Sequence, residues 1–156
     1  MIKKVSTLCL LQKDNQLLLG YKKRGLGQGR WNGFGGKVNN GETIEQAARR
    51  ELLEEANLAA DRLEKFGVIN FVFQHNSELH EVHIYRVISY IGEITESEEM
   101  KPQWFDINNL PYDQMWPDDQ IWYDYFFAGK KFRGEFTFKD FDNILEHKIW
   151  ETDILN

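Results

Sequence analysis

The sequence predicts an α+β fold, a mixed β-sheet with helices packed on it. Short apolar and β-branched runs typical of strands outnumber the two segments with helical signals. These elements do not alternate as β-α-β units, so an all-parallel sheet is not expected. A chain of 156 residues can bury a sizeable core without disulfides, and we expect residues 1–156 to form one domain.

The first part of the chain predicts a β-hairpin followed by a loop. Residues 5–12 (VSTLCLLQ) and 16–22 (QLLLGYK) are strand-like, and Asp14-Asn15 between them is a turn signal. Residues 25–36 are rich in glycine and contain two large aromatic side chains, which indicates a structured loop.

The next segment predicts the clearest helix. Thr43, followed three residues later by Gln46, fits a capping box, in which each side chain bonds the backbone N–H of the other residue. An apolar stripe at helical spacing follows, at Ile44, Ala47, Ala48 and Leu52.

Residues 68–74 and 81–91 predict two further strands, joined by the turn HNSE. In the second strand, the apolar Val82, Ile84 and Ile88 are two or four residues apart and so point to the same face. His83 points to the opposite face. We therefore expect a half-buried strand, with His83 facing solvent or a groove.

The last third predicts a strand, a helix and a hairpin. Residues 103–107 are strand-like, and residues 117–129 read as a helix with Pro117 at its first position and Gly129 as its stop signal. The final hairpin is expected from residues 131–138 and 142–150.

Charge and composition exclude several partners. The net charge of −6 disfavours a stable complex with nucleic acid. No apolar stretch approaches the ~20 residues of a membrane span, and the single Cys9 in an apolar run suits a reduced, cytoplasmic protein. Residues 22–30 carry four Lys and Arg side chains and no acid, which leaves open a small-anion site or a solvated basic loop.

Three carboxylates follow the Gly35-Gly36 pair. Glu51, Glu54 and Glu55 are related by i, i+3 and i+4, so they share one helical face. A hard divalent cation such as Mg²⁺ would offset their repulsion, and the glycines would let a backbone carbonyl approach it. On these acids alone, a solvated helix face is the simpler interpretation.

The wider spacing carries more information. Gly36, five residues, Glu42, seven residues and then RELLEEANL at 50–58 resemble the signature of the Nudix hydrolases, G-x5-E-x7-R-E-U-x-E-E-x-G-U, where U is bulky and apolar. The one departure is Asn57 in place of glycine, and Asn also adopts the left-handed conformation. The resemblance implies the Nudix fold, an α/β/α sandwich, and a single Nudix hydrolase domain.

The resemblance also implies roles for individual residues. Glu55 or Glu54 would orient or deprotonate the attacking water, Arg50 would align Glu54, and Glu42 would support the start of the helix. Mg²⁺, for which Mn²⁺ can substitute, would be bound by a set of oxygen ligands: Gly36, Glu51, Glu54, Glu55 and, from outside the motif, Glu99.

Stretches outside the motif resemble the MutT-homologue branch of this family, whose mammalian members hydrolyse oxidised purine nucleoside triphosphates. GRWNGFGGKV at 29–38 and MWPDDQIWY at 115–123 carry the likeness, with Leu26 standing where the mammalian proteins have phenylalanine. The residues that the resemblance implies in substrate binding are Thr7, Lys22, Asn32, Phe34, Gly35, Gly36, Lys37, Trp116, Pro117, Asp118 and Asp119.

The chemistry of these residues suits a purine. Trp116 offers a stacking plane worth ~1–3 kcal/mol, and Asn32 offers a donor and an acceptor. Asp118 and Asp119 are adjacent acids in an apolar neighbourhood, so burial and repulsion should raise the pKa of at least one. Such a pair can donate or accept, whereas the alternative interpretation is that the two acids simply start a helix.

The resemblance therefore implies a pyrophosphohydrolase that converts 8-oxo-dGTP or 2-hydroxy-dATP to the monophosphate and pyrophosphate, which cleanses the nucleotide pool. We expect a cytoplasmic monomer with a small nucleotide substrate and no membrane association. Two alternatives stay open. One is a Nudix hydrolase of a methylated purine triphosphate, a dinucleotide polyphosphate or ADP-ribose, and the other is a non-catalytic nucleotide-binding module.

Overall fold

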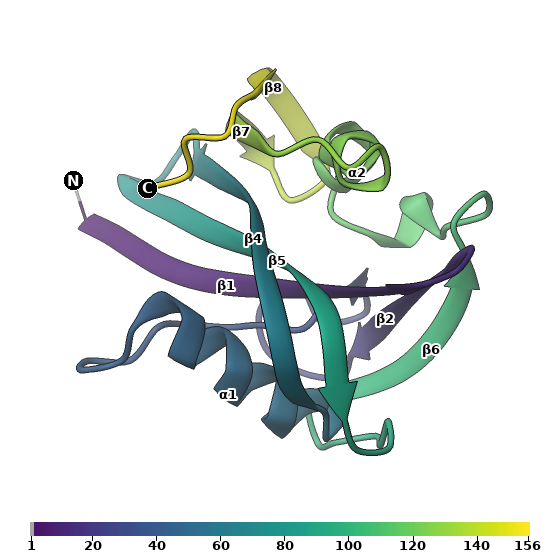
Figure 1. Ribbon diagram of the computed structural model, residues 1–156. Helices are drawn as coiled ribbons and strands as arrows, with labels where there is room; N and C mark the ends of the chain where they lie inside the picture. Colours follow the sequence, from purple (N-terminus) through teal and green to yellow (C-terminus); the bar gives the residue numbers. More distant parts are fainter. Residues whose placement is uncertain (1) are drawn as a thin grey trace.

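Strands dominate the computed structural model, which describes residues 2–156 (Figure 1). Over these residues an eight-stranded sheet accompanies two α-helices and a short 3-10 helix. The strands are β1 (Ile2–Lys13), β2 (Gln16–Lys22), β3 (Trp31–Asn32), β4 (Ala59–Phe73), β5 (Glu78–Ile91), β6 (Met100–Asp106), β7 (Phe132–Asp140) and β8 (Asn143–Glu151). The helices are α1 (Ile44–Ala56), η1 (Tyr112–Gln114) and α2 (Asp119–Phe127).

The sheet is mixed, as expected. Its order is β3-β2-β1-β5-β4-β7-β8, and β6 pairs with β2 off this path. β1 runs parallel to β5 and β4 runs parallel to β7, whereas the other pairs are antiparallel. Isolated bridges at Ser6–Lys37 and Cys9–Phe34 tie β1 to the segment after β3. The glycine pair inside that segment therefore lies beside the middle of β1.

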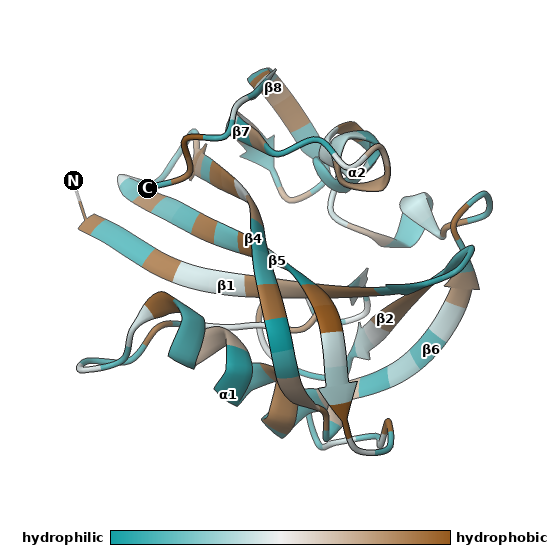
Figure 2. Cartoon of the chain, in the orientation of Figure 1, coloured by the Kyte–Doolittle hydropathy of each residue, from teal (hydrophilic) through white to brown (hydrophobic). Residues whose placement is uncertain are grey.

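Two hydrophobic cores lie on opposite faces of the central strands. Along β1, Leu8 and Leu10 enter one core, while Cys9 and Leu11 enter the other. α2 packs into the first core and α1 into the second, and Figure 1 shows the two helices on opposite sides of the sheet. Apolar and polar segments alternate along β4 and β5 in Figure 2. The predicted sandwich of a mixed sheet between helices is confirmed.

Residues at its two ends determine where α1 begins and stops. Thr43 Oγ1 accepts a hydrogen bond from Gln46 N at 3.1 Å, and Gln46 Oε1 accepts one from Thr43 N at 2.9 Å, so the predicted capping box forms. At the other end Asn57 has φ +61° and donates its N–H to Leu53 O at 3.0 Å. Asn57 thus ends the helix in the left-handed conformation, as expected for the residue that replaces glycine.

β4 is much longer than the strand predicted at 68–74. It begins at Ala59, and its pairing with β5 shifts register between Ala60 and Arg62 and again between Lys65 and Gly67. Each shift inserts an extra residue, which breaks the alternation that a sequence pattern relies on. The alternation of apolar and polar residues therefore does not predict the early part of β4.

The prediction of a half-buried β5 was wrong. Ile84 packs in the core beside α2, but Tyr85 and Val87 pack in the core beside α1. β5 is therefore covered on both faces, by α2 on one side and by α1 on the other. His83, expected to face solvent or a groove, is 4% exposed and lines neither of the two cavities described below, and its Nε2 lies 2.7 Å from Glu81 Oε1.

α2 begins two residues later than predicted. Asp119 N donates to Trp116 O at 3.1 Å, so Pro117 and Asp118 form a turn before the first helical residue. Pro117 therefore does not occupy the first helical position. The predicted stop at Gly129 is confirmed, because this glycine has φ +72° and donates its N–H to Phe126 O at 3.1 Å.

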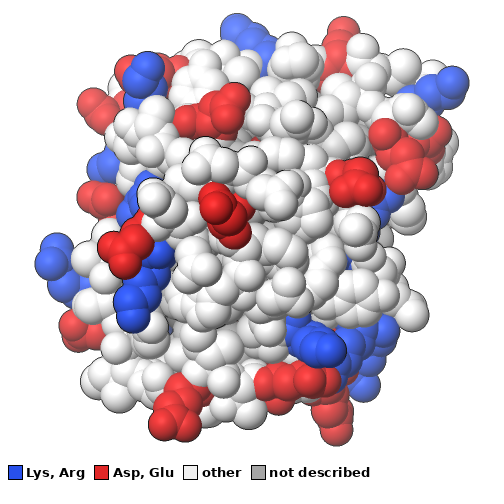
Figure 3. Space-filling view, turned by 90° about the vertical axis from the view of Figure 1, so that its right-hand side faces the viewer, with Lys and Arg blue, Asp and Glu red and all other residues white. Residues whose placement is uncertain are grey.

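Basic and acidic side chains are interspersed on the face shown in Figure 3. The basic segment 22–30 is largely neutralised by acids from elsewhere: Lys23 pairs with Glu96, and Arg30 with Asp142. All four basic side chains of the segment are thus paired with acids, so the segment is not an unpaired basic loop, and Lys22 lines the cavity described below. Among residues 2–156, no helix combines the length and apolar character needed to cross a bilayer.

Candidate active site

A cavity of about 380 Å³ opens beside the centre of β1. β1, the glycine pair, α1 and the turn before α2 all contribute to its wall, so it joins segments that are far apart in the sequence. The predicted site residues that line it are Thr7, Lys22, Asn32, Gly35, Gly36, Lys37, Glu55, Trp116, Asp118 and Asp119.

The glycine pair packs directly against β1. A Cβ added to Gly35 would lie 1.8 Å from Thr7 O, and Thr7 N donates to Gly36 O at 2.9 Å. Only a residue without a side chain fits this approach of two backbones. The Gly36 carbonyl oxygen accepts from Thr7 N and also, at 3.5 Å, from Thr7 Oγ1.

Glu55 is the most buried of the three motif glutamates on α1. It is 3% exposed, and its Oε1 accepts a hydrogen bond from Gly35 N at 2.8 Å. Burial raises the pKa of Glu55 to about 7, against the lowering effects of the Gly35 N–H and the charge of Lys22. A carboxyl group that titrates near neutral pH can both accept and return a proton there.

Glu51 and Glu54 occupy different environments. The Glu51 carboxylate packs on Gly36, because a Cβ at that glycine would lie 2.6 Å from Glu51 Oε1. The Glu51 side chain is 15% exposed, whereas that of Glu54 is 57% exposed. Glu51 and Glu55 therefore face the glycine pair, and Glu54 lies toward solvent.

Arg50 connects the motif acids. It was expected to align Glu54, which it contacts at 3.3 Å, but its shorter bonds go to Glu42, at 2.6 and 3.0 Å, and to Glu51, at 2.9 Å. Hydrogen bonding to Arg50 lowers the pKa of Glu42. Arg50 thus ties the residue before the helix to the helix itself, and Glu51 is positioned more directly than Glu54.

Lys22 lies between two acidic side chains, Glu55 and Glu99. Its Nζ is 2.9 Å from Glu99 Oε2 and 3.9 Å from Glu55 Oε2, so Glu99 is brought to the motif from outside it. Within residues 2–156, no three His, Cys, Asp or Glu side chains converge closely enough to form a ready-made metal site. Glu55 and Glu99 nevertheless present carboxylate oxygens around the Lys22 ammonium, and oxygen is the ligand atom that a hard divalent ion prefers.

The indole of Trp116 forms an aromatic part of the wall. The Arg30 guanidinium carbon lies 4.7 Å from the centroid of this ring, and Phe138 approaches it edge to face at 6.4 Å. Sequence reasoning identified Trp116 but not the arginine on its face. A contact between residues so far apart in the chain leaves no local signal.

The two adjacent acids differ in their contacts. Asp118 Oδ2 accepts from Trp122 Nε1 at 3.0 Å, whereas Asp119 is 3% exposed and its Oδ2 has no hydrogen-bond partner among the described residues. Burial raises the pKa of Asp118 to about 6, and burial with the Asp118 charge raises the pKa of Asp119 well above its usual range. Neither side chain makes a capping hydrogen bond, but Asp118 is the N-cap residue of α2 and Asp119 lies in its first turn, where the helix dipole favours an acid, so the pair also stands at a helix start as the alternative interpretation expects.

Asn32 uses one of its groups internally. Its Oδ1 accepts from Gly33 N at 2.8 Å, which leaves the amide NH₂ as the group to offer a ligand. Phe34 is fully buried in the core beside α1 and does not line the cavity, and Pro117 is only partly buried beside Trp116. Their contribution to a ligand site is therefore to hold the neighbouring backbone.

Several wall residues were not predicted. Phe71 and His80 both line the cavity, and their rings stack with centroids 4.6 Å apart and planes 4° apart. Burial lowers the pKa of His80. Both residues sit within strands, where nothing in the sequence separates a cavity wall from an ordinary packed position.

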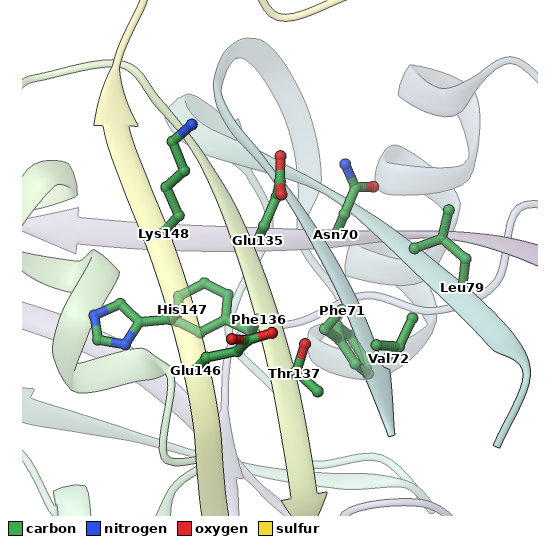
Figure 4. Close-up of a pocket in the computed structure, with 10 residues that line it drawn as sticks. All are labelled: Asn70, Phe71, Val72, Leu79, Glu135, Phe136, Thr137, Glu146, His147 and Lys148. Atoms are coloured by element: carbon green, nitrogen blue, oxygen red, sulfur yellow. The ribbon is translucent and has the colours of Figure 1, made fainter. Parts of the chain in front are cut away.

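A second cavity, of about 420 Å³, lies over β4, β7 and β8 (Figure 4). Asn70, Glu135 and Lys148 from these three strands project in the same direction along its wall. This cavity contains none of the motif residues and neither Asp118 nor Asp119. We therefore locate the candidate active site in the first cavity.

Comparisons with known proteins identify the family of the chain. A family model described as NUDIX domain matches residues 2–126. The chain is 54% identical over 152 residues to the oxidized purine nucleoside triphosphate hydrolase of Danio rerio, with 97% of each chain covered. It is 51% identical over 147 residues to the protein of that name from Mus musculus, with 94% of each covered. Among solved structures, the mMutator MutT protein from Bacillus halodurans matches with a TM-score of 0.81 at 24% identity, covering 94% of this chain and 97% of that chain.

Proposed function

The chain belongs to the NUDIX family, and from this membership we propose that it is a metal-dependent pyrophosphohydrolase that cleanses the nucleotide pool. Its substrates are oxidised purine nucleoside triphosphates such as 8-oxo-dGTP and 2-hydroxy-dATP, which it converts to the monophosphate and pyrophosphate. The names of the Danio rerio and Mus musculus relatives support this class. The observation that carries the proposal is a single cavity whose wall includes the buried Glu55 and Asp119 together with the half-buried Asp118.

The motif residues would act on the phosphates. Mg²⁺ or Mn²⁺, held by Glu51, Glu54, Glu55, Glu99 and the Gly36 carbonyl, would supply charge neutralisation and a more acidic water when bound. The Gly35 N–H orients the Glu55 carboxylate, which accepts the proton of the attacking water. Lys22, placed between Glu55 and Glu99, contributes positive charge beside the phosphates.

The aspartate pair would read the purine edge. A carbonyl on that edge needs a donor, and a ring N–H needs an acceptor. With their pKa values raised, Asp118 and Asp119 can share protons so that one donates while the other accepts. Trp116 supplies the stacking plane and the Asn32 amide supplies a further donor.

Replacing the proposed base tests the function. Wild type should release pyrophosphate from 8-oxo-dGTP with Mg²⁺, and Glu55→Gln should lower kcat by about 100-fold or more, the usual range for loss of a general base. Glu45→Gln, on the exposed first turn of the same helix, is the matched control and should retain activity. If Glu55→Gln stays within about twofold of wild type, the role assigned to Glu55 is wrong.

A substrate panel separates the alternatives. We would compare kcat/KM for 8-oxo-dGTP, 2-hydroxy-dATP, a methylated purine triphosphate, a dinucleotide polyphosphate and ADP-ribose. The proposal requires an oxidised purine triphosphate to rank first. A preference for ADP-ribose over every modified triphosphate would reject the pocket assignment, and tight nucleotide binding without turnover would indicate a non-catalytic module.

We further propose that residues 1–156 act as one catalytic domain, and as a cytoplasmic monomer on free nucleotides. β7 and β8 lie beyond the residues that the family model matches, but they continue the same sheet through the parallel pairing of β7 with β4. Their inclusion in one domain rests on this continuity. Light scattering at micromolar protein tests the monomer directly.

A further inference from the structure

Three residues outside the proposed chemistry pack around the Trp116 indole. The Arg30 guanidinium carbon lies 4.7 Å from the ring centroid, and Arg30 Nη1 also donates to Met115 O at 3.1 Å. On the loop before β3, a Cβ added to Gly27 would meet Trp116 Nε1 at 3.2 Å. Phe141 meets the indole edge to face, with centroids 5.5 Å apart and planes 72° apart.

The turn between β7 and β8 fixes two of these contacts. Asp142 Oδ1 accepts from Arg30 Nη2 at 2.5 Å, which links the turn to the arginine on the indole face. The turn is itself ordered, because Asp140 Oδ1 accepts from Asp142 N and from Asn143 Nδ2, both at 2.9 Å. The turn therefore presents an aromatic ring and an acid at fixed positions.

Phe141 is an unusual choice for the tip of a turn. It is 47% exposed, so its burial contributes less than that of a core phenylalanine. Its ring packs against Phe73 at 5.1 Å and against Trp116, and it does not line the cavity. Among the rings that Phe141 contacts, the Trp116 indole is the one that lines the cavity.

We infer that Phe141, supported by the Arg30–Asp142 pair, is a positioning residue that fixes the plane of Trp116 for stacking on the purine. The inference rests on the proposed function, because it places a purine on that indole. An indole ordered before the ligand arrives loses less rotational freedom on binding, which lowers KM. The contact leaves kcat unchanged, because it touches no reacting group.

Steady-state kinetics with 8-oxo-dGTP test the inference. Phe141→Ala should raise KM about threefold to tenfold, the range expected for loss of one edge-to-face aromatic contact, with kcat within about twofold of wild type. Phe141→Tyr keeps the ring and should restore the wild-type KM. Leu145→Ala is the matched control, because Leu145 is 50% exposed on β8 of the same hairpin and does not line the cavity.

A double-mutant cycle separates positioning from general destabilisation. In a Trp116→Leu background, which keeps an apolar surface, Phe141→Ala should change KM by less than about 1.5-fold, because the contact is already lost. An unchanged KM in the single variant, or the same rise in both backgrounds, overturns the inference.

Titration with 8-oxo-dGMP repeats the cycle without turnover. If wild type binds 8-oxo-dGMP but does not hydrolyse 8-oxo-dGTP, the proposed function fails while the cycle still decides the role of Phe141. If wild type hydrolyses 8-oxo-dGTP and the effects of Phe141→Ala and Trp116→Leu on binding are additive, only the positioning role fails. If wild type neither binds nor hydrolyses these purines, both are overturned.

Discussion

A methyl group on Gly35 would lie 1.8 Å from the backbone oxygen of Thr7. Gly35→Ala must therefore push the glycine pair away from β1, which strains the Thr7 N to Gly36 O bond and moves the N–H that orients Glu55. We expect a loss of unfolding free energy of roughly 3 kcal/mol or more, from overpacking and a broken buried hydrogen bond. Urea denaturation gives this value.

Gly41→Ala is the control for that experiment. Gly41 has φ +85° but no atom within 4 Å of an added Cβ, so only backbone strain opposes alanine there. Its cost should be about 1–2 kcal/mol. Equal losses in the two variants would show that the close approach of Gly35 to β1 is unimportant.

Asp119 should control which purine is preferred. Asp119→Asn replaces a group that can donate or accept, according to its protonation, with an amide of fixed donors and one acceptor. We expect the ratio of kcat/KM for 8-oxo-dGTP and 2-hydroxy-dATP to change by about tenfold or more, equivalent to about 1.4 kcal/mol. Asp124→Asn, exposed on the same helix, is the control. An unchanged ratio across pH 6 to 9 would contradict proton sharing by the pair.

At the scale of elements, α1 carries the motif acids and depends on its first cap. Thr43→Ala removes the acceptor for Gln46 N and should lower the unfolding free energy by about 1 kcal/mol. Thr43→Ser keeps an acceptor oxygen and should stay near wild type. Thermal unfolding of the three proteins measures the difference, and a Thr43→Ala protein as stable as wild type would mean that the cap contributes nothing.

The same helix shows what sequence patterns can predict. The cap at Thr43 and the left-handed Asn57 were predictable because each depends on residues within one turn. The burial of His83 was not, because β5 is covered on both faces by elements distant in sequence. The pairing of Lys23 with Glu96 was not predictable either, because the two residues are far apart in the sequence.

At the scale of the whole molecule, the cavity exists because the two halves of the chain meet around β1. Glu55 comes from α1, on one face of the sheet, while Asp119 comes from α2, on the other, yet both line one cavity. The family motif identified the carboxylates, and the flanking likeness identified Trp116. Neither identified Arg30, Phe71 or His80, whose positions follow only from the way the sheet closes the cavity.

Burial of the aspartate pair should also show in the stability of the entire protein. The folded-state pKa values of Asp118 and Asp119 are raised, so the folded protein holds protons that the unfolded chain releases near pH 4. Their contribution to stability is therefore fully present below about pH 4 and is lost as pH rises through about 6, the folded pKa of Asp118, and further as Asp119 ionises. The double variant Asp118→Asn/Asp119→Asn should not lose stability in this way, because its two amide side chains do not ionise.

Other groups change stability over the same range, so the measured quantity is the difference between the double variant and wild type. Hydrogen bonds and opposite charges lower the pKa of Glu42 and Glu99, which stabilises the folded state as pH rises, but both proteins share these groups. From pH 4 to pH 8 the unfolding free energy of the variant should gain on wild type by roughly 3 kcal/mol or more, since each pKa unit corresponds to about 1.4 kcal/mol and the pKa values of both aspartates are raised. Denaturant titrations at each pH give the curve. A difference independent of pH would mean that both aspartates ionise in the folded protein as readily as in the unfolded chain, and proton sharing could not then read the purine.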